Sequence, residues 1–359
     1  MIPVTKSYIP DLDSYTSTVK RAFDNAWLTN RGELVEELED NLSDYLNLKD
    51  TQLFCLNNGT TPIQIALKLL ANGGEVITTP FSYVATTAAI VWENCTPVFV
   101  DIHKDYLTID ESKIEEAITD KTTCILATHV FGNPCNIDAI EKIAKKHGLK
   151  VIFDAAHCFG VKYKGKSIFE FGDVSTCSFH ATKLFHSGEG GGIFCKDKEL
   201  FQSLFHGHNF GHNGPYDFHG LGINGKMSEL HAALGLTVLK HIDEIIVNRK
   251  VAVEYYKEQL STTVISHLKI RESVEWNYSY LPVIFKSEEA LLKALNDLEQ
   301  KEIFPRRYFY PSLNKLNYIT PITMNVSEDV SSRVLCLPLF SGLSKGDIDL
   351  ICQTINNSN

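Results

Sequence analysis

The chain has 359 residues, with 34 Lys plus Arg against 44 Asp plus Glu, so its formal net charge at pH 7 is −10. This acidic balance excludes a generally basic nucleic-acid binder. Hydrophobic residues make up 44% and charged residues 22% of the chain, which is typical of a globular protein and excludes disordered, collagen-like and coiled-coil chains.

The N-terminal residues Met1 to Lys6 show no basic segment leading into a long apolar run, and no later stretch approaches about 18 uncharged apolar residues. We therefore expect neither a cleaved secretion signal nor a membrane span. The nine cysteines form no C-x-x-C pair, and most lie in apolar, strand-like runs such as 53–56 and 123–126. This pattern predicts reduced core thiols in a cytoplasmic protein.

Between about residues 50 and 200, short apolar runs alternate with amphipathic segments of helix length, which predicts a parallel sheet covered by helices. The predicted strands are 52–56, 75–78, 97–101, 123–128, 150–154, 174–179 and 191–195. The predicted helices between them are 62–71, 84–93, a stretch around 115–118, and 137–147. These elements make up one α/β domain.

Two further helices, 227–242 and 244–260, are predicted from apolar residues at three- and four-residue spacing. The elements predicted after them are a strand at 278–285, a helix at 288–300, an irregular stretch rich in Arg, Tyr and Pro, and a closing helix near 347–355. We predict an N-terminal arm and a large α/β domain over residues 1–249, and a smaller α+β domain over residues 250–359.

The segment from Val151 to Cys195 carries the most informative pattern. The apolar strand 151–153 ends at Asp154, and in a parallel α/β sheet the carboxyl ends of the strands face the ligand crevice. A carboxylate there is placed to meet a ligand. Taken alone, Asp154 could equally cap a following helix.

Lys183 follows the predicted strand that carries Ser178 and precedes the glycine-rich run 188–192. A lysine held in a cleft by such a turn loses part of its solvation, which disfavours the ammonium form and frees the amine as a nucleophile. Most lysines are solvated surface charges, and that reading stays open for Lys183 taken by itself.

The turn at 57–62, Asn-Asn-Gly-Thr-Thr-Pro, joins a predicted strand to a predicted helix. Free backbone N–H groups and the positive end of that helix form an anion site, and Gly59 allows a phosphate to approach closely. Thr60 and Ser178 could add hydroxyl donors. The alternative is an ordinary strand-to-helix turn with a threonine cap.

Together, a phosphate site, a carboxylate at a strand end and a lysine after a later strand are the three groups needed to hold pyridoxal 5′-phosphate. The turn anchors the phosphate, Asp154 keeps the pyridine nitrogen protonated, and Lys183 bonds to the aldehyde. The sequence therefore predicts an enzyme that uses this cofactor.

These motifs resemble those of the sugar aminotransferases of the DegT/DnrJ/EryC1/StrS type, which have the aspartate aminotransferase (type I) fold, and the resemblance covers nearly the whole chain. The matching segments are 27–29 (WLT), 58–60 (NGT), 154–160 (DAAHCFG), 178–183 (SFHATK), 188–191 (GEGG) and 222–229 (GINGKMSE). The resemblance implies that Lys183 carries the cofactor and that Asp154 pairs with its ring nitrogen. His157, at a position often occupied by glutamine, would contact the ring and its 3′-oxygen.

The resemblance implies further cofactor contacts. Tyr83 matches an aromatic residue that stacks on the cofactor, although a core aromatic is the alternative. The residues that would bind the phosphate from one subunit are Asn58, Gly59, Thr60 and Ser178. Asn224 would reach the phosphate of the neighbouring subunit, so the active sites would lie at a homodimer interface.

The implied reaction moves an amino group from L-glutamate to a nucleotide-linked keto sugar in two stages, with Lys183 as general base and acid. The spelling SFHATK is closer to family members that aminate the sugar at C4 than at C3, which favours dTDP-4-keto-6-deoxy-D-glucose as acceptor and dTDP-4-amino-4,6-dideoxy-D-glucose as product. Arginine suits the diphosphate because its planar fork donates two parallel hydrogen bonds. The candidate substrate contacts are Arg31, His186, Arg306, Arg307 and Tyr308.

Several alternatives remain. Within the fold they are a 3-keto-sugar transaminase, a sugar dehydratase, in which histidine replaces the lysine, and an epimerase or lyase. A nicotinamide-dependent oxidoreductase is disfavoured because the run 188–192 lacks the G-x-G-x-x-G spacing. A zinc protein is disfavoured because no Cys or carboxylate completes a recognised spacing with the loop histidines. Those histidines are His206, His208, His212 and His219.

Overall fold

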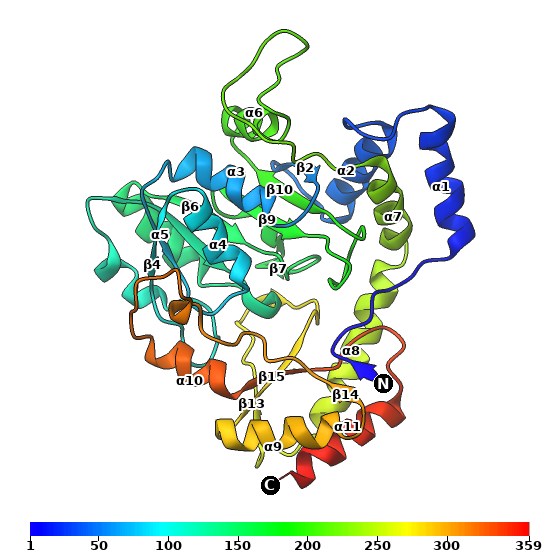
Figure 1. Ribbon diagram of the computed structural model, residues 1–359, viewed down its shortest axis with the longest axis vertical. Coiled ribbons are helices and arrows are strands. Elements are labelled where there is room, and N and C mark those ends of the chain that lie inside the picture. Colours follow the sequence, from blue (N-terminus) through cyan, green and yellow to red (C-terminus); the bar gives the residue numbers. More distant parts are fainter. Residues whose placement is uncertain (359) are drawn as a thin grey trace.

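The structure is a computed structural model and describes residues 1–358. A seven-stranded sheet forms its centre (Figure 1). The strands are β2 (Gln52–Leu56), β3 (Glu75–Thr78), β4 (Thr96–Phe99), β5 (Thr122–Thr128), β6 (Lys150–Asp154), β9 (Val174–Ser178) and β10 (Gly191–Cys195). They lie in the order β2, β10, β9, β6, β5, β3, β4, and only the two pairs made by β10 are antiparallel. The predicted α/β class with a mainly parallel sheet is confirmed.

Helices cover both faces of this sheet. The helices are α1 (Leu12–Asp24), α2 (Glu33–Tyr45), α3 (Thr61–Leu70), α4 (Val84–Trp92), α5 (Ile137–His147), α6 (Lys198–Gly207) and α7 (Glu229–Leu239). On β6, Val151 and Phe153 join a buried cluster with α2, α5 and α7, whereas Ile152 joins one with α3, α4 and α6. Successive strand residues point to opposite faces, so a continuous apolar strand supplies both cores at once.

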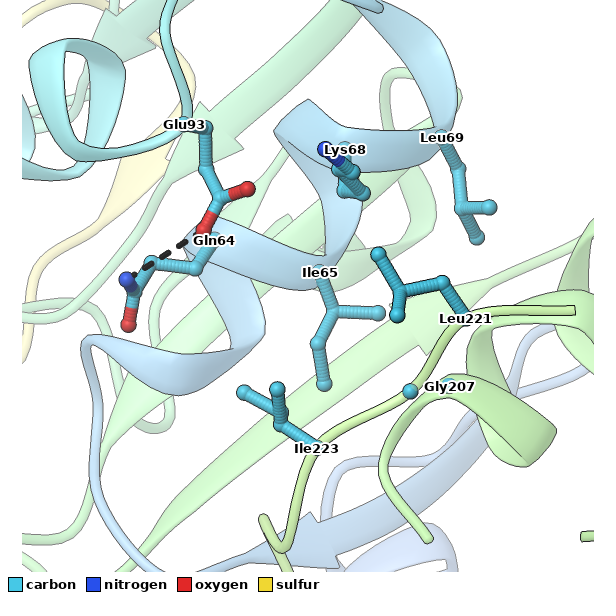
Figure 2. Close-up of a pocket in the computed structure, with 9 residues that line it drawn as sticks. Gln64, Ile65, Lys68, Leu69, Glu93, Gly207, Leu221 and Ile223 are labelled. Atoms are coloured by element: carbon cyan, nitrogen blue, oxygen red, sulfur yellow. Dashed lines mark hydrogen bonds between the residues drawn. The ribbon is translucent and has the colours of Figure 1, made fainter. Parts of the chain in front are cut away.

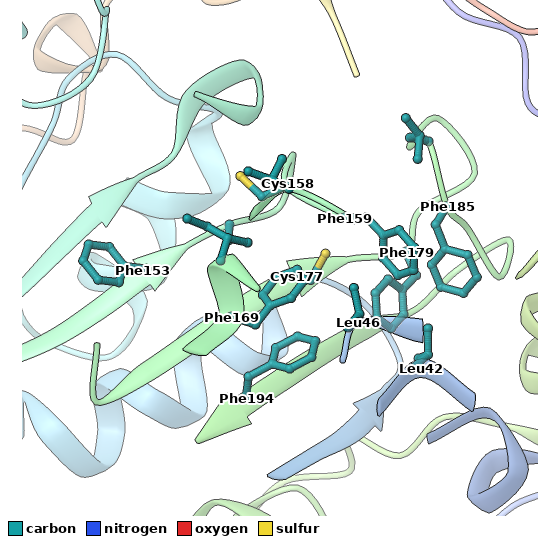
Figure 3. Close-up of a cluster of buried hydrophobic side chains, with 14 of the residues drawn as sticks. Leu42, Leu46, Phe153, Cys158, Phe159, Phe169, Cys177, Phe179, Phe185 and Phe194 are labelled. Carbon is teal, nitrogen blue, oxygen red and sulfur yellow. The ribbon is translucent and has the colours of Figure 1, made fainter. Parts of the chain in front are cut away.

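The larger of these clusters lies between the sheet and the helices α2 and α7. Figure 3 shows its aromatic side chains together with two cysteines, Cys158 and Cys177. Phe169 stacks on Phe194 with ring centroids 4.0 Å apart. All nine cysteines are buried with free thiols, as predicted for core residues.

A smaller antiparallel sheet lies at the C-terminal end of the molecule, at the bottom of Figure 1. Its strands are β11 (Ile265–His267), β13 (Leu281–Phe285) and β15 (Val334–Leu337), and the helices of this part are α8 (Ile242–Gln259), α9 (Glu288–Glu299), α10 (Asn325–Arg333) and α11 (Lys345–Asn357). Short strands join distant segments: β1 (Ile2–Pro3) pairs with β14 (Ile303–Phe304), and β7 (Lys162–Tyr163) pairs with both β8 (Lys166–Ser167) and β12 (Val274–Glu275).

Helix α8 runs without a break through residue 249, at which the sequence places the domain boundary. Its first turns belong to the core of the large sheet through Ile242 and Ile245. Its later turns belong to the core of the small sheet through Val253 and Tyr256. The helix therefore connects the two parts, and the division at residues 249 and 250 stays a prediction.

The observed helices and strands differ in several places from those predicted from the sequence. The arm before residue 50, for which no helix is predicted, contains α1 and α2, and α6 and α10 are also additional. The predicted strand at 278–285 begins only at Leu281, because Tyr278 has a φ of +55°, which extended backbone does not allow. The helix expected around 115–118 consists of two short 3₁₀ turns, Glu111–Lys113 and Glu115–Ala117.

No helix within residues 1–358 has the length and apolar character to cross a bilayer.

Candidate active site

Six strands of the large sheet end at the same edge. They are β2, β3, β4, β5, β6 and β9, which point the same way because β10 is antiparallel to both β2 and β9 while the other pairs are parallel. In α/β sheets the ligand crevice lies outside the carboxyl ends of such strands. The polar residues at or just beyond these ends are Asn58, Ser82, Thr128, Asp154 and Ser178.

A cavity of about 370 Å³ lies at this edge, within the range of small-molecule sites. Its walls come from three stretches that are far apart in the chain, 58–86, 128–189 and 280–309. The sequence-predicted residues that line it are Asn58, Gly59, Thr60, Tyr83, Asp154, His157, Ser178, Lys183, Arg306 and Tyr308. Among the described residues, Lys183 is the only lysine in this wall.

Lys183 lies in the turn after β9, and its side chain is half-buried. Its Nζ donates a hydrogen bond to the Tyr280 hydroxyl oxygen at 3.1 Å. Burial lowers the pKa of Lys183, but Tyr280 and the nearby Asp154 together raise it above its ordinary value. Desolvation favours the neutral amine, as expected, but the pKa of Lys183 is raised overall rather than lowered, because the oxygen atoms around Nζ outweigh the effect of burial.

Asp154 is buried, and its carboxylate accepts hydrogen bonds from the Thr86 hydroxyl at 2.7 Å and the Ala156 N–H at 3.1 Å. Behind Thr86, the Ser82 and Thr128 hydroxyls continue the chain, with oxygen–oxygen distances of 2.8 and 3.2 Å. Burial raises the pKa of Asp154, whereas the Thr86 hydrogen bond lowers it. A row of hydroxyls therefore supports a carboxylate that water cannot solvate.

His157 is buried on the cavity wall, and its Nδ1 accepts a hydrogen bond from the Phe131 N–H at 3.1 Å. A neutral imidazole has one donor and one acceptor nitrogen, so Nε2 carries the proton. Burial lowers the pKa of His157 well below its ordinary value, and the positive charge of Lys183 lowers it further. His157 is therefore a neutral ring that offers one N–H as a donor.

The turn after β2 is organised by the Asn58 side chain. Its Oδ1 accepts hydrogen bonds from the Thr60 and Thr61 N–H groups at 2.8 and 2.9 Å. These two N–H groups at the start of α3 are thus already paired, which differs from the expectation of free N–H groups at this helix end. A Cβ on Gly59 would lie 2.6 Å from Cβ of Ser178, so only glycine allows these two segments to approach.

Aromatic rings form the wall that faces the C-terminal part. Tyr280 lies 4.7 Å from the His157 ring, and Phe309 is nearly parallel to that ring at 5.9 Å. Tyr83 is 58% exposed and its ring lies 6.4 Å from Phe309. Sequence reasoning missed Tyr280 and Phe309, because one stands in a predicted strand and the other in an irregular stretch, and neither position carries a local signal.

Comparison with known proteins identifies the family. The model of the DegT/DnrJ/EryC1/StrS aminotransferase family matches residues 12–356. The chain belongs to this family. It is 39% identical to the dTDP-4-amino-4,6-dideoxy-D-glucose transaminase of Shigella dysenteriae, over 98% of this chain and 97% of that protein. The predicted family, the predicted fold class and the predicted transaminase activity are confirmed.

Two solved structures share the fold of this chain. DesI, determined in the presence of its TDP-sugar product, has a TM-score of 0.92 and 29% identity, and the match covers 99% of this chain and 92% of DesI. Spr1654 of Streptococcus pneumoniae in its PLP form has a TM-score of 0.91 and 26% identity, with 99% and 98% coverage. Both similarities cover 99% of this chain.

The cavity fits the pyridoxal phosphate that this family implies. It combines a buried carboxylate on Asp154, a lysine amine and the hydroxyl of Ser178, which lies directly against Gly59. A carboxylate held in a buried cavity by a single side-chain donor has room for a cationic partner such as a protonated ring nitrogen. The donor set therefore matches a phosphorylated pyridine that carries an aldehyde.

The structure brings only part of the predicted substrate contacts to this cavity. Arg306 and Tyr308 line it. Arg31 instead pairs with Glu36 and Glu39, and Arg307 pairs with Glu288 at 2.6 Å.

His186 is buried, and its Nε2 donates to the Tyr8 carbonyl at 2.8 Å. Asn224 is exposed and accepts a hydrogen bond from Lys226 at 2.7 Å. Within one chain, Arg31, Arg307, His186 and Asn224 do not line the cavity.

A second, smaller cavity of about 90 Å³ lies between α3 and the loop 221–223. Figure 2 shows the aliphatic side chains of Ile65, Leu221 and Ile223 around it, and a hydrogen bond from Gln64 to Glu93 of 3.3 Å. It holds no buried carboxylate and its lysine, Lys68, is exposed, so it does not compete with the larger cavity as an active site.

The histidines considered for zinc have other partners. His206 Nδ1 donates to the His212 carbonyl at 2.8 Å, and His208 Nδ1 hydrogen-bonds to the Phe205 carbonyl. Within residues 1–358, no three His, Cys, Asp or Glu side chains are arranged to hold a metal ion. His206 belongs to α6 and His208 caps it, whereas the loop that carries His212 and His219 projects from the body of the molecule beside α6 (Figure 1).

Proposed function

We propose that this chain transfers an amino group from L-glutamate to dTDP-4-keto-6-deoxy-D-glucose and forms dTDP-4-amino-4,6-dideoxy-D-glucose. The observation that carries this proposal is the convergence of Lys183, Asp154 and the Asn58–Thr60 turn on one cavity. The choice of sugar is supported by the Shigella dysenteriae transaminase named for that product, with which this chain shares 39% identity.

The cavity residues have separate tasks in holding the cofactor. Asp154 would pair with the ring nitrogen, the Nε2–H of His157 would donate to the 3′-oxygen, and Tyr83 would cover the ring. The phosphate would be held by the groups at the strand ends, which are Asn58, Gly59, Thr60 and Ser178. When bound, pyridoxal phosphate supplies an aldehyde that bonds to amines and a ring that stabilises negative charge on the neighbouring carbon.

Lys183 performs the proton transfers in this proposal. Its Nζ is the only lysine amine among the described residues of the cavity wall. It would take a proton from the donor in the first half of the reaction and return one to the sugar in the second. Arg306 is exposed at the cavity and has no carboxylate partner in residues 1–358, so it is free to bind the donor carboxylate or the sugar diphosphate.

The partner subunit completes the site in this proposal. Asn224 lies outside the cavity of its own chain and is exposed. We propose that it binds the phosphate in the neighbouring subunit of a homodimer, and that Arg31 and His186 act through their contacts with Glu36, Glu39 and the Tyr8 carbonyl. The buried free thiols further support a reducing compartment, the cytoplasm.

Product analysis tests the proposal directly. The purified protein, loaded with pyridoxal phosphate and L-glutamate, is offered dTDP-, UDP- and GDP-linked 3-keto and 4-keto sugars. We expect amination only at C4, with the dTDP-linked 6-deoxy sugar preferred. A new C–N bond at C3 would instead support the 3-keto-sugar alternative, and loss of the sugar hydroxyl without amination would support a dehydratase.

A spectroscopic test addresses the cofactor alone. The loaded protein is expected to be yellow, and its visible absorption band is expected to change when L-glutamate is added. A colourless protein that gains no band with added pyridoxal phosphate contradicts the proposal. Lys183→Ala is expected to abolish turnover while the far-UV circular dichroism stays unchanged.

A further inference from the structure

The Tyr280 side chain reaches the cavity from the C-terminal part of the chain. It immediately precedes β13, and it lies 97 residues after Lys183. The segment before it is firmly held: the Asn277 side-chain amide donates to the His157 and Phe159 carbonyls, both at 2.9 Å. The Ser279 hydroxyl also donates to the His157 carbonyl at 2.9 Å. The backbone that carries Tyr280 is therefore fixed to the wall that holds His157.

The Tyr280 ring is positioned by its neighbours as well. Its centroid lies 4.7 Å from that of His157 and 5.8 Å from those of Phe131 and Tyr308. On the far side of Ser279, the buried Arg249 donates from Nη1 to the Ser279 carbonyl at 3.0 Å. The phenol oxygen is thus a fixed point in the cavity, and Lys183 Nζ donates to it at 3.1 Å.

We propose that Tyr280 is a positioning residue that holds the Lys183 amine by a hydrogen bond whenever that amine is not bonded to the cofactor. This inference rests on the proposed function, in which Lys183 carries the cofactor and moves the protons. A lysine side chain is a flexible four-carbon stem, so an amine released from the cofactor needs a partner to stay in reach. Tyr280 supplies that partner, and Nζ keeps its place between the two halves of the reaction.

The groups around Lys183 determine how the loss of Tyr280 would change the pKa of this lysine. Burial disfavours the Lys183 ammonium, while Tyr280, Asp154 and Tyr308 favour it and raise the pKa of Lys183. The other titratable groups of the cavity wall are Tyr83, His157, His180, Glu189 and Arg306. Without the Tyr280 oxygen, the lowering of the Lys183 pKa by burial is offset less. The pKa therefore falls, and the amine becomes neutral at a lower pH than in the wild type.

The test compares Tyr280→Phe with the wild type and with Tyr278→Phe. Tyr278 stands two residues earlier, packs on Trp276 at 4.7 Å and does not line the cavity, so it is a matched control for the loss of a phenol. In the cofactor-free proteins, acetylation of Lys183 by acetic anhydride is followed against pH and mapped by peptide mass spectrometry. We expect the pH midpoint of Lys183 labelling to be lower in Tyr280→Phe only. Equal midpoints in all three proteins would overturn the proposal.

Kinetics of the loaded proteins give the second readout. We expect Tyr280→Phe to lower kcat by about tenfold, with KM for the sugar unchanged; the loss is smaller than the roughly 10²–10⁴-fold contribution of a general base, because Lys183 itself remains. An unchanged kcat, or an equal loss in Tyr278→Phe, would overturn the proposal. If Tyr280→Phe does not fold, a crystal structure of the wild type with the aminated cofactor decides: Nζ within hydrogen-bond distance of the phenol supports it, and Nζ directed elsewhere overturns it.

The wild type separates this inference from the proposed function. A wild-type protein that binds no pyridoxal phosphate contradicts the proposed function, and with it the positioning role of Tyr280. A wild type that is yellow and active beside an equally active Tyr280→Phe contradicts only the role of Tyr280.

Discussion

Asp154 illustrates how single hydroxyl groups make a buried charge tolerable. Burial raises the pKa of this carboxyl, and the Thr86 hydrogen bond opposes that rise. Thr86 in turn is held by Ser82, whose hydroxyl lies 2.8 Å from it. Each of these side chains is small and fully enclosed, so the hydrogen bonds are not exchanged with water.

Thr86→Val tests this support. The substitution keeps the shape of the side chain but removes the donor to Asp154, so the pKa of Asp154 rises further and less carboxylate is available for the ring nitrogen. A hydrogen bond to a charged group contributes about 1.5–3 kcal/mol, so we expect pyridoxal phosphate to bind roughly tenfold or more weakly at neutral pH. Fluorescence titration of the cofactor-free protein measures the affinity.

The neighbouring Thr87 provides the control. It lies on the same helix, α4, is fully buried, and its hydroxyl oxygen has no hydrogen-bond partner among the described residues. Thr87→Val is therefore expected to leave cofactor affinity unchanged. Equal affinities of Thr86→Val and the wild type would show that Asp154 does not depend on this hydroxyl.

At the scale of elements, the N-terminus of α2 is capped by a residue of another helix. Gly32, its N-cap, offers no side chain. Instead the buried carboxylate of Glu229, the first residue of α7, accepts hydrogen bonds from the N–H groups of Gly32 and Leu34 at 2.9 and 2.7 Å. The negative charge also lies at the positive end of the helix. The contact between α2 and α7 is therefore electrostatic as well as apolar.

Glu229→Gln is expected to destabilise the protein by about 1–3 kcal/mol, because an amide group then faces backbone donors in a buried place. Urea unfolding measures the change in the free energy of unfolding. Glu244→Gln is the control: Glu244 is an exposed carboxylate in the first turn of α8, 3.9 Å from His241. Similar stabilities of the two variants would argue against the cap.

Helix α2 also meets β2 through one buried carboxylate. Glu39 accepts hydrogen bonds from the Cys55 N–H at 2.8 Å and from Arg31 Nε at 2.9 Å. Burial is the largest effect and raises the pKa of Glu39 from 4.5 to about 7, although Cys55 and Arg31 lower it. The folded chain therefore binds this proton more tightly than the unfolded chain does.

The sign of the pH dependence follows from that difference. Between about pH 4.5 and 7 the folded state holds more protons on Glu39 than the unfolded state, so stability falls as the pH rises through this window. The loss contributed by Glu39 is on the order of 3 kcal/mol at and above neutral pH. Glu39→Gln is expected to reduce this decrease in the free energy of unfolding with rising pH, as measured by urea unfolding at several pH values. Glu36→Gln, on the exposed side of the same helix, is expected to leave the fall in place.

At the scale of the whole molecule, the cavity lies where the two parts of the chain meet. An apolar cluster joins Phe81 and Phe131 of the large part to Phe309 and Cys336 of the C-terminal part. The pairing of β1 with β14 ties the N-terminus to the same C-terminal part. The relative position of Lys183 and Tyr280 depends on these contacts, and the proposed dimer would add Asn224 from outside.

Subunit complementation tests the shared site. Lys183→Ala and Asn224→Ala proteins are expected to be inactive or strongly impaired alone. A mixed dimer contains one site with an intact Lys183 from one subunit and an intact Asn224 from the other, so mixing after mild denaturation is expected to restore activity. If Asn224 acts in its own chain, every site of the mixed dimer is defective and mixing restores nothing.

The sequence by itself determined the strands of the large sheet and the reacting groups at their ends. Apolar runs bounded by turns set β2, β6 and β9, and the rule for parallel sheets then placed Asp154 and Lys183 at one edge. Such features are local, because each depends on only a few consecutive residues of the chain. The family motifs added His157 and Ser178 for the same reason.

Tertiary structure alone decided which distant residues complete the cavity. Thr86 lies 68 residues from Asp154, and Tyr280 lies 97 residues from Lys183. No local period or spacing reports such contacts, because they depend on how α4 and the C-terminal part pack against the sheet. For the same reason the sequence could not tell that Arg306 enters the cavity while Arg307 turns to Glu288. It also gave the opposite sign for the pKa of Lys183, which depends on oxygen atoms that only folding brings near Nζ.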